Sequence, residues 1–204
     1  MYLSDSDRFV PMQKTADSLP EIASTYSDAA WPAASHTTTN NSMKPSTPVV
    51  LYSSDYGFHT GYILWRGHFV AGGSESSFSI TAIGGAAFGY SVWLNSTFLG
   101  SWVGNAPTSQ NSQTFSFAKL AKGGSYVVTI LQDHMGLEED FTAAGDQFKT
   151  PRGILSYSFP SSTSTKISTW KVTGNLGGED VSDLQYRGDT ALTLGSMLTE
   201  PADR

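Results

Sequence analysis

The segment DHMGLEEDFTAAGDQFKTPR, residues 133–152, holds the densest group of side chains suited to chemistry in this 204-residue sequence. It combines five acidic residues with a histidine and aromatic rings. Carboxylates accept hydrogen bonds from hydroxyl groups, and an aromatic ring can stack on the apolar face of a sugar. The candidate carbohydrate-contact residues are Asp133, His134, Glu138, Glu139 and Phe141.

Other interpretations of residues 133–152 stay open. The segment shows no alternation, and at about twenty residues it exceeds the usual connection between strands, which indicates a packed or functional loop. A solvated loop or a contact between domains is the simpler interpretation of the same residues. The carboxylates could also bind calcium, but their spacing matches no known cation-binding loop, so we predict no metal site.

The remaining chemical candidates are weaker. His59 and His68 flank one strand-like run with Asp55 nearby, and satisfied core or surface histidines explain them better than a metal pair does. Serine, histidine and aspartate are all present, but no nucleophile elbow supports a catalytic triad. The glycines of residues 174–178 precede no helix, which excludes a dinucleotide fingerprint. We therefore predict no catalytic residue and no cofactor.

The run VVLYSSDYGFHTGYILWRGHF, residues 49–69, is the stretch around which the rest of the chain is organised. Side chains alternate across a strand, so Leu64 and Arg66 point to one face while Ile63 and Trp65 point to the other. Both faces carry bulky side chains. We expect this strand to be buried on both sides, and a buried Arg66 then needs a partner.

The other segments that must position these residues also have the pattern of strands. Residues 77–82 alternate, residues 88–95 and 98–103 form a hairpin, and residues 126–132 are a core strand. In residues 153–159, Leu155, Tyr157 and Phe159 are expected to face inward, with Ile154 apart. Residues 104–111 are expected to be a loop, and residues 167–172 the last strand.

The spacing of these segments predicts an all-β fold. About eight or nine strands recur near every ten residues with no long helix, which is typical of a jelly-roll β-sandwich. We expect residues 1–18 to be a frayed lead-in, residues 19–188 to be the sandwich, and residues 189–204 to be a tail outside it. The structural anchors expected for this domain are Trp31, Trp65, Arg66, Trp93, Trp102, Arg152 and Trp170.

Composition excludes several classes of partner. The net charge of -6 and the scattered basic residues argue against nucleic acid, and no apolar run approaches a membrane span. The absence of cysteine excludes disulfides. The first residues do not have the pattern of a signal peptide. Two sequons make Asn40 and Asn95 candidate N-glycosylation sites in a secretory setting.

Several long words of the sequence are specific enough to indicate a family. They are LPEIASTYSDAAW (19–31), SDYGFHTGYILWRGHF (54–69), GGAAFGYSVWLNSTFLGSW (84–102), MGLEEDF (135–141), PRGIL (151–155) and TWKVTGNLGGED (169–180). Together these words closely resemble the first of the C-terminal, galactose-binding-like jelly-roll domains of fungal β-galactosidases of glycoside hydrolase family 35.

The resemblance implies an extracellular parent enzyme that hydrolyses terminal β-galactosides in carbohydrate metabolism. Its two catalytic glutamates would stand on a separate (β/α)₈ barrel, which takes about 250 residues and has no counterpart in this pattern. The resemblance therefore predicts a non-catalytic accessory domain, with the barrel and a neighbouring jelly roll as partners. The alternative is a stand-alone module that binds β-galactoside sugars.

Overall fold

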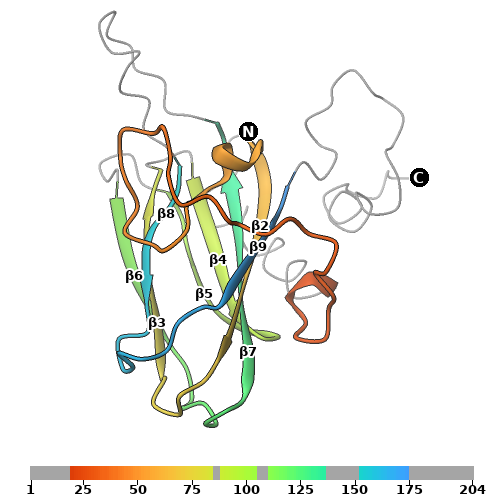
Figure 1. The fold of residues 1–204 in the computed structure, drawn as a ribbon, viewed down its shortest axis with the longest axis vertical. Coiled ribbons are helices and arrows are strands. Elements are labelled where there is room, and N and C mark those ends of the chain that lie inside the picture. The colour runs from red at the N-terminus through yellow and green to blue at the C-terminus, as the bar shows by residue number, and fades with distance from the viewer. Residues whose placement is uncertain (1–18, 85–87, 105–109, 137–151, 175–204) are drawn as a thin grey trace, which may run out of the picture.

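The computed structural model describes residues 19–84, 88–104, 110–136 and 152–174. Two antiparallel sheets face each other across a common core (Figure 1). The strands are β1 (Leu51–Tyr52), β2 (Gly61–Val70), β3 (Ser77–Ile83), β4 (Phe88–Leu94), β5 (Thr97–Trp102), β6 (Gln110–Ser116), β7 (Ser125–His134), β8 (Gly153–Ser158) and β9 (Thr169–Thr173). Two short 3₁₀ turns, η1 (Pro20–Ile22) and η2 (Ser53–Tyr56), complete the assigned elements.

The strand order confirms a jelly-roll β-sandwich. One sheet has the order β1-β8-β3-β6 and the other β5-β4-β7-β2-β9. Strands β1 and β8, β2 and β7, β3 and β6, and β4 and β5 therefore pair as in a long hairpin rolled over on itself, with β9 added beside β2. None of the helical turns within the described ranges has the length and apolar character needed to cross a membrane.

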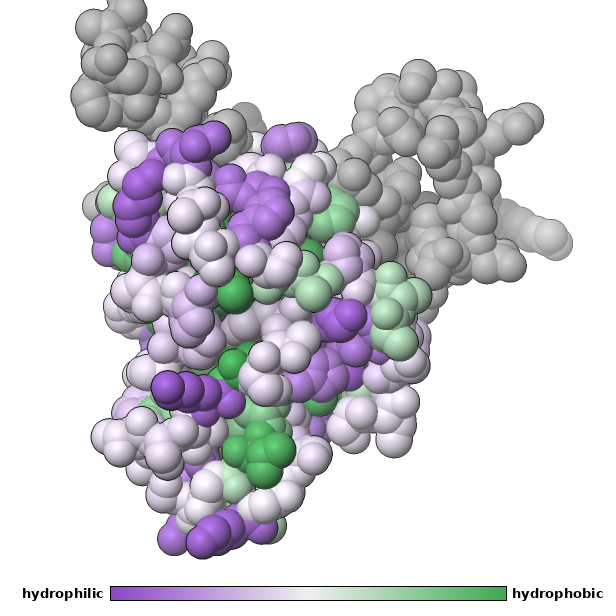
Figure 2. Space-filling model, viewed as in Figure 1, coloured by the Kyte–Doolittle hydropathy of each residue, from purple (hydrophilic) through white to green (hydrophobic). Residues whose placement is uncertain are grey.

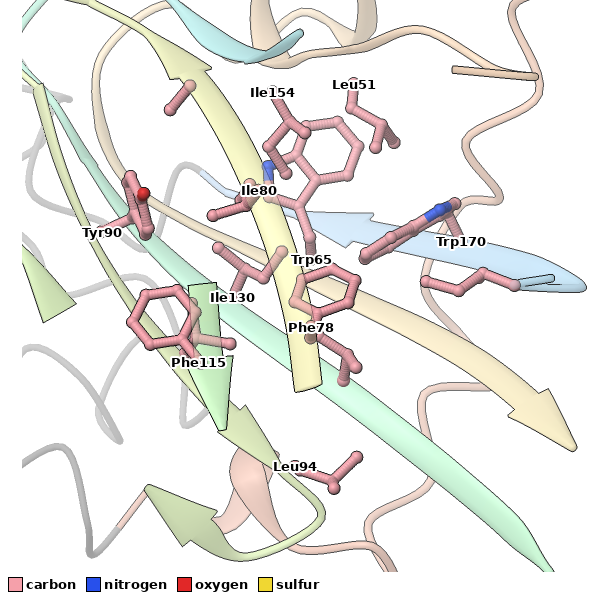
Figure 3. Close-up of a cluster of buried hydrophobic side chains, with 14 of the residues drawn as sticks. Leu51, Trp65, Phe78, Ile80, Tyr90, Leu94, Phe115, Ile130, Ile154 and Trp170 are labelled. Atoms are coloured by element: carbon pink, nitrogen blue, oxygen red, sulfur yellow. The ribbon is translucent and has the colours of Figure 1, made fainter. Parts of the chain in front are cut away.

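The main core lies between the sheets and draws large side chains from both. Figure 3 shows Trp65, Ile130 and Tyr90 of the five-stranded sheet meeting Phe78 and Ile80 of the four-stranded sheet. All five are buried. Removing this apolar surface from water supplies the main driving force for folding.

A second, smaller core lies on the outer face of the five-stranded sheet. Leu64 of β2, Trp93 of β4 and Leu131 of β7 point away from the main core and pack against Leu19 and Ile22. The irregular segment 19–34 lies along this face and ends in a bridge between Ala33 and Lys171 of β9 (Figure 1). The prediction that the second half of the organising run, now β2, is buried on both sides is thus confirmed.

Two predictions about strands were wrong. Ile154 belongs to the main core, whereas Leu155 packs in a separate cluster with Val50 and Tyr52. The cause is a bulge: Thr81 pairs with Ser156 and Ala82 with Ile154, so Leu155 is an extra residue that shifts the alternation.

The second wrong prediction concerns residues 104–111, which were expected to form a loop. Strand β6 begins at Gln110, and Gln110 and Asn111 pair with Ile83 and Ala82 of β3. These first residues of β6 are polar on both faces, so the sequence carries no apolar alternation there.

Candidate functional site

The strand ends that flank the acidic segment gather at one end of the sandwich. His134 at the end of β7 lies opposite Gly61 of β2 and Phe88 of β4, while Gly153 of β8 lies opposite Ile83 of β3. We refer to the end marked by these five residues as the loop end, because the connections that follow β1, β3, β5 and β7 all depart from it. Glu138, Glu139 and Phe141 lie outside the described residues.

Asp133 and His134 are the two predicted contact residues that the structure describes. Asp133 is half-buried, and burial raises the pKa of its carboxyl group. His134 is only 1% exposed and packs its ring edge-on against Phe88. Its Nδ1 accepts a hydrogen bond from the N–H of Gly136 at 3.0 Å. Of the pair, Asp133 is therefore the one with exposed surface.

The electrostatics of His134 favour a neutral ring. Burial, and next the positive charge of Arg152, lower the pKa of its imidazole to about 4. A neutral ring with Nδ1 as acceptor carries its hydrogen on Nε2. At neutral pH His134 thus adds no charge to the loop end.

Arg152 is hydrogen-bonded to the first residues of two loops at the loop end. This side chain is buried, and it donates from Nε to the carbonyl of Gly136 and from Nη1 to the carbonyl of Gly84. Gly136 precedes and Arg152 follows residues 137–151, so the ends of the acidic segment are hydrogen-bonded to each other. Gly136 has φ of +98°, a left-handed backbone that favours glycine at this position.

A second charged cluster joins segment 19–34 to β2. Arg66 is fully buried and donates from Nε to Asp28 Oδ2 at 2.7 Å and from its Nη atoms to the carbonyls of Glu21, Ala23 and Tyr26. His68 Nε2 also lies 2.7 Å from Asp28 Oδ2. The sequence predicted that Arg66 needs a partner but did not indicate Asp28, because a partner distant in sequence has no local signal.

His68 is bonded within the same cluster rather than to Asp55. Its ring is bonded to Asp28, whereas Asp55 accepts a weaker hydrogen bond from the Asn41 side chain at 3.4 Å. Within the described ranges, no group of three histidine, aspartate or glutamate residues could hold a metal ion. His68 thus has a hydrogen-bond partner in Asp28, 40 residues away in the sequence.

Comparison with known proteins gives the family. Residues 26–138, more than half of the chain, match the family described as the beta-galactosidase second all-beta domain. The chain belongs to this family. Its curated relatives include beta-galactosidase A of Aspergillus niger, 54% identical, and probable beta-galactosidase A of Aspergillus fumigatus, 53% identical, each over 188 residues. These alignments cover 92% of this chain but only 18% of each relative.

The tryptophans of this beta-galactosidase domain are mostly interior. Trp65, Trp93 and Trp170 are buried, while Trp31 and Trp102 are half-buried. Trp65 donates to Gln132, and Trp102 packs on Tyr90 with ring centroids 5.7 Å apart. Stacking on a sugar needs a bare ring face, so these positions fit the packing of the family's sandwich better than a sugar platform.

The two sequon asparagines of the domain differ in their surroundings. Asn40 is exposed in the polar stretch before β1. Asn95 is half-buried in the two-residue turn between β4 and β5, with φ of 51°. Its Oδ1 accepts a hydrogen bond from the N–H of Val127 at 3.0 Å. Asn95 therefore joins the turn of the β4–β5 hairpin to β7.

One further buried carboxylate, Glu75, has no signal in the sequence pattern. Its side chain is fully buried and accepts hydrogen bonds from the N–H groups of Gly72, Gly73 and Ser74 and from the hydroxyl of Thr165. Burial alone would raise the pKa of Glu75, but these hydrogen bonds outweigh it and lower the pKa to about 2. Glu75 lies in the connection between β2 and β3, away from the loop end, and holds that turn together.

Proposed function

We propose that this chain acts as a non-catalytic accessory domain of an extracellular, family-35 β-galactosidase, packed beside a separate catalytic barrel and a neighbouring jelly roll. The observation that carries the proposal is the match of residues 26–138 to an accessory domain family, within relatives of which the chain covers 18%. The described fold is a sandwich rather than a barrel of alternating strands and helices, which favours a non-catalytic accessory role.

The loop end is the surface proposed to face the substrate entrance. Its acidic segment starts at half-buried Asp133, and the hydrogen bond from Arg152 to the Gly136 carbonyl joins the two ends of that segment. Asp133, Glu138, Glu139 and Phe141 would then contact a galactoside near the mouth of the barrel, with His134 packed beneath them. A second candidate function, a stand-alone galactose-binding module, draws on the same carboxylates and aromatic ring.

The exposed surface offers limited support for docking elsewhere. Among the described residues, the large hydrophobic side chains that are exposed are Val70, Val103 and Met135. Figure 2 shows hydrophobic residues on the viewed face as small separate patches rather than one broad area. Val103 and Met135 directly follow β5 and β7 at the loop end, which favours that end as a contact surface.

The accessory role is tested by a domain exchange. The segment of Aspergillus niger beta-galactosidase A that aligns with this chain is replaced by this chain, and the two enzymes are compared with a deletion variant. We expect the exchange variant to hydrolyse a chromogenic galactoside and the deletion variant to lose activity or stability. An exchange variant no better than the deletion variant would contradict the accessory role.

The binding role is tested on the isolated full chain. Galactose and lactose are titrated up to tens of millimolar while amide signals are followed by heteronuclear NMR, with the chromogenic galactoside as an activity control. Shifts centred on residues 133–141, abolished in Glu138→Gln/Glu139→Gln/Phe141→Ala but kept in the distant control Thr114→Ala, would establish a binding module. No shifts and no turnover would contradict the stand-alone binding module and restrict sugar contacts to the assembled enzyme. Hydrolysis of the galactoside by the chain alone would overturn both proposals.

A further inference from the structure

The inward face of β7 becomes polar toward the loop end. Val128 and Ile130 belong to the main core, and the next inward residues along the strand are Gln132 and His134. Gln132 is fully buried. A primary amide inside an apolar core must have its hydrogen bonds satisfied, because an unpaired polar group there is destabilising.

Half of the Gln132 amide is satisfied by β2. Trp65 Nε1 donates to Gln132 Oε1 at 2.7 Å. An indole nitrogen can only donate, so this bond fixes which side of the amide is oxygen. In the sheet order β4-β7-β2, Trp65 of β2 stands on one side of β7, and β4 is the neighbour on the other side.

Tyr90 stands on the opposite side of Gln132. The two residues are directly paired between β4 and β7, and both side chains point into the core. Paired side chains on one face have Cβ atoms about 5 Å apart. Burial raises the pKa of the Tyr90 hydroxyl, so Tyr90 keeps its proton and can both donate and accept.

Neither polar atom has a hydrogen-bond partner within the part of the chain that the structure describes. Both Tyr90 Oη and Gln132 Nε2 are buried, yet they do not bond to each other or to another group there. Two unsatisfied polar atoms would each lower the folding equilibrium constant by roughly tenfold or more. Buried water usually occurs at such sites, where it bonds to two to four polar groups.

We propose that a buried water molecule bridges Gln132 Nε2 and Tyr90 Oη inside the loop end of the sandwich. The water accepts a hydrogen bond from the amide and exchanges one with the hydroxyl. His134 Nε2, two residues further along β7, is another buried nitrogen without a partner in the described ranges.

The first test is the sign of the stability change in Tyr90→Phe, measured by urea unfolding of the full chain. If water bridges the pair, removing the hydroxyl leaves the amide without its bridged partner, and the folding equilibrium constant should fall by roughly tenfold or more. If the hydroxyl is unsatisfied, the same change should leave stability unchanged or raise it. Tyr52→Phe is the matched control, because Tyr52 Oη donates to the Met43 carbonyl at 3.2 Å.

The second test observes the water directly. In the full chain, rotating-frame NMR cross-peaks from long-lived water should reach the side-chain NH₂ of Gln132, disappear in Tyr90→Phe, and persist in Tyr52→Phe. A destabilised Tyr90→Phe with no water cross-peak in the wild type would point to a protein partner and overturn the proposal. A Tyr90→Phe variant as stable as the wild type would overturn it as well.

Discussion

The outer faces of the two sheets differ in polarity. On the five-stranded sheet, Leu64, Trp93 and Leu131 form a second core that segment 19–34 covers. On the four-stranded sheet, β3 and β6 present hydroxyl groups that pair across the strands: Ser79 Oγ lies 2.7 Å from Thr114 Oγ1, and Thr81 Oγ1 lies 2.8 Å from Ser112 Oγ. The first face is apolar and covered across β4, β7 and β2. The second is polar along most of β3 and β6, and its apolar cluster of Val50, Tyr52, Ile83 and Leu155 is confined to the end near β1.

This difference shows why the covered face needs a buried charge. Segment 19–34 has little regular structure, so its backbone carbonyls need hydrogen-bond donors from elsewhere once water is excluded. Arg66 supplies them to Glu21, Ala23 and Tyr26, and Asp28 neutralises the guanidinium. The planar guanidinium can reach several acceptors at once, which a lysine ammonium does less well.

The largest effect should follow from removing this donor. Arg66→Met removes the buried guanidinium that pairs with Asp28 and donates to three carbonyls, so we expect the free energy of unfolding to fall by about 3–5 kcal/mol. Urea unfolding measures the loss, and limited proteolysis should begin within residues 19–34. Lys171→Met is the control, because Lys171 also holds this segment but through one bond to the Trp31 carbonyl at 2.9 Å. Equal losses in the two variants would show that Arg66 is no special anchor.

The next largest effect should come from the apolar part of the covered face. Leu64 is fully buried although it points away from the main core. Leu64→Ala should therefore behave as a core truncation and lower the free energy of unfolding by roughly 2–5 kcal/mol, since a cavity remains beneath the segment. Differential scanning calorimetry or urea unfolding measures it. A loss below about 1 kcal/mol would indicate that residues 19–34 leave this face in solution.

Acid should weaken the covered face through Asp28. Burial alone would raise the pKa of Asp28, but hydrogen bonds from His68 and Arg66, followed by their charges, outweigh burial and lower it. A lowered folded pKa means that the contribution is present above the ordinary value of 3.8 and is lost as pH falls through the folded value. We expect Asp28→Asn to cost about 1–3 kcal/mol near neutral pH and nothing at the acid limit.

Glu21 also changes the stability of the covered face with pH, in the opposite direction to Asp28. Burial raises the pKa of Glu21, so its contribution runs the other way: it is present below 4.5 and is lost as pH rises through the raised folded value. The pH profile of Asp28→Asn is therefore best compared within Glu21→Gln. If Glu21→Gln and the double variant Asp28→Asn/Glu21→Gln differ in free energy of unfolding by the same amount at every pH, the Asp28 charge does not hold the segment.

The two outer faces also mark what the sequence could and could not predict. Bulky residues at consecutive positions of β2 indicated burial on both faces and a partner for Arg66, and clean alternation in β3 indicated a half-exposed strand. Both follow from the two-residue period of a strand. The identity of Asp28 as the partner did not follow, because it depends on how an irregular segment folds back over 38 residues.

The errors have the same origin. A single extra residue at Leu155 reversed the expected facing of Ile154, because alternation cannot reveal where a bulge falls. At the candidate site, the sequence indicated Asp133 and His134 as equals, but the ladder turned His134 inward against Phe88. Which of two neighbours faces the core depends on pairing with β2 and β4, and that pairing is not local.

The smallest effect should come from the hydroxyl face. Ser79 and Thr114 are paired with each other near the surface, where water can replace either partner. Ser79→Ala, Thr114→Ala and the double variant should each change the free energy of unfolding by no more than about 0.5 kcal/mol, because exposed polar contacts contribute little. Urea unfolding of all three gives the coupling energy as well. A loss above about 1 kcal/mol would make this face a structured surface in its own right, and the contrast with the covered face would then fail.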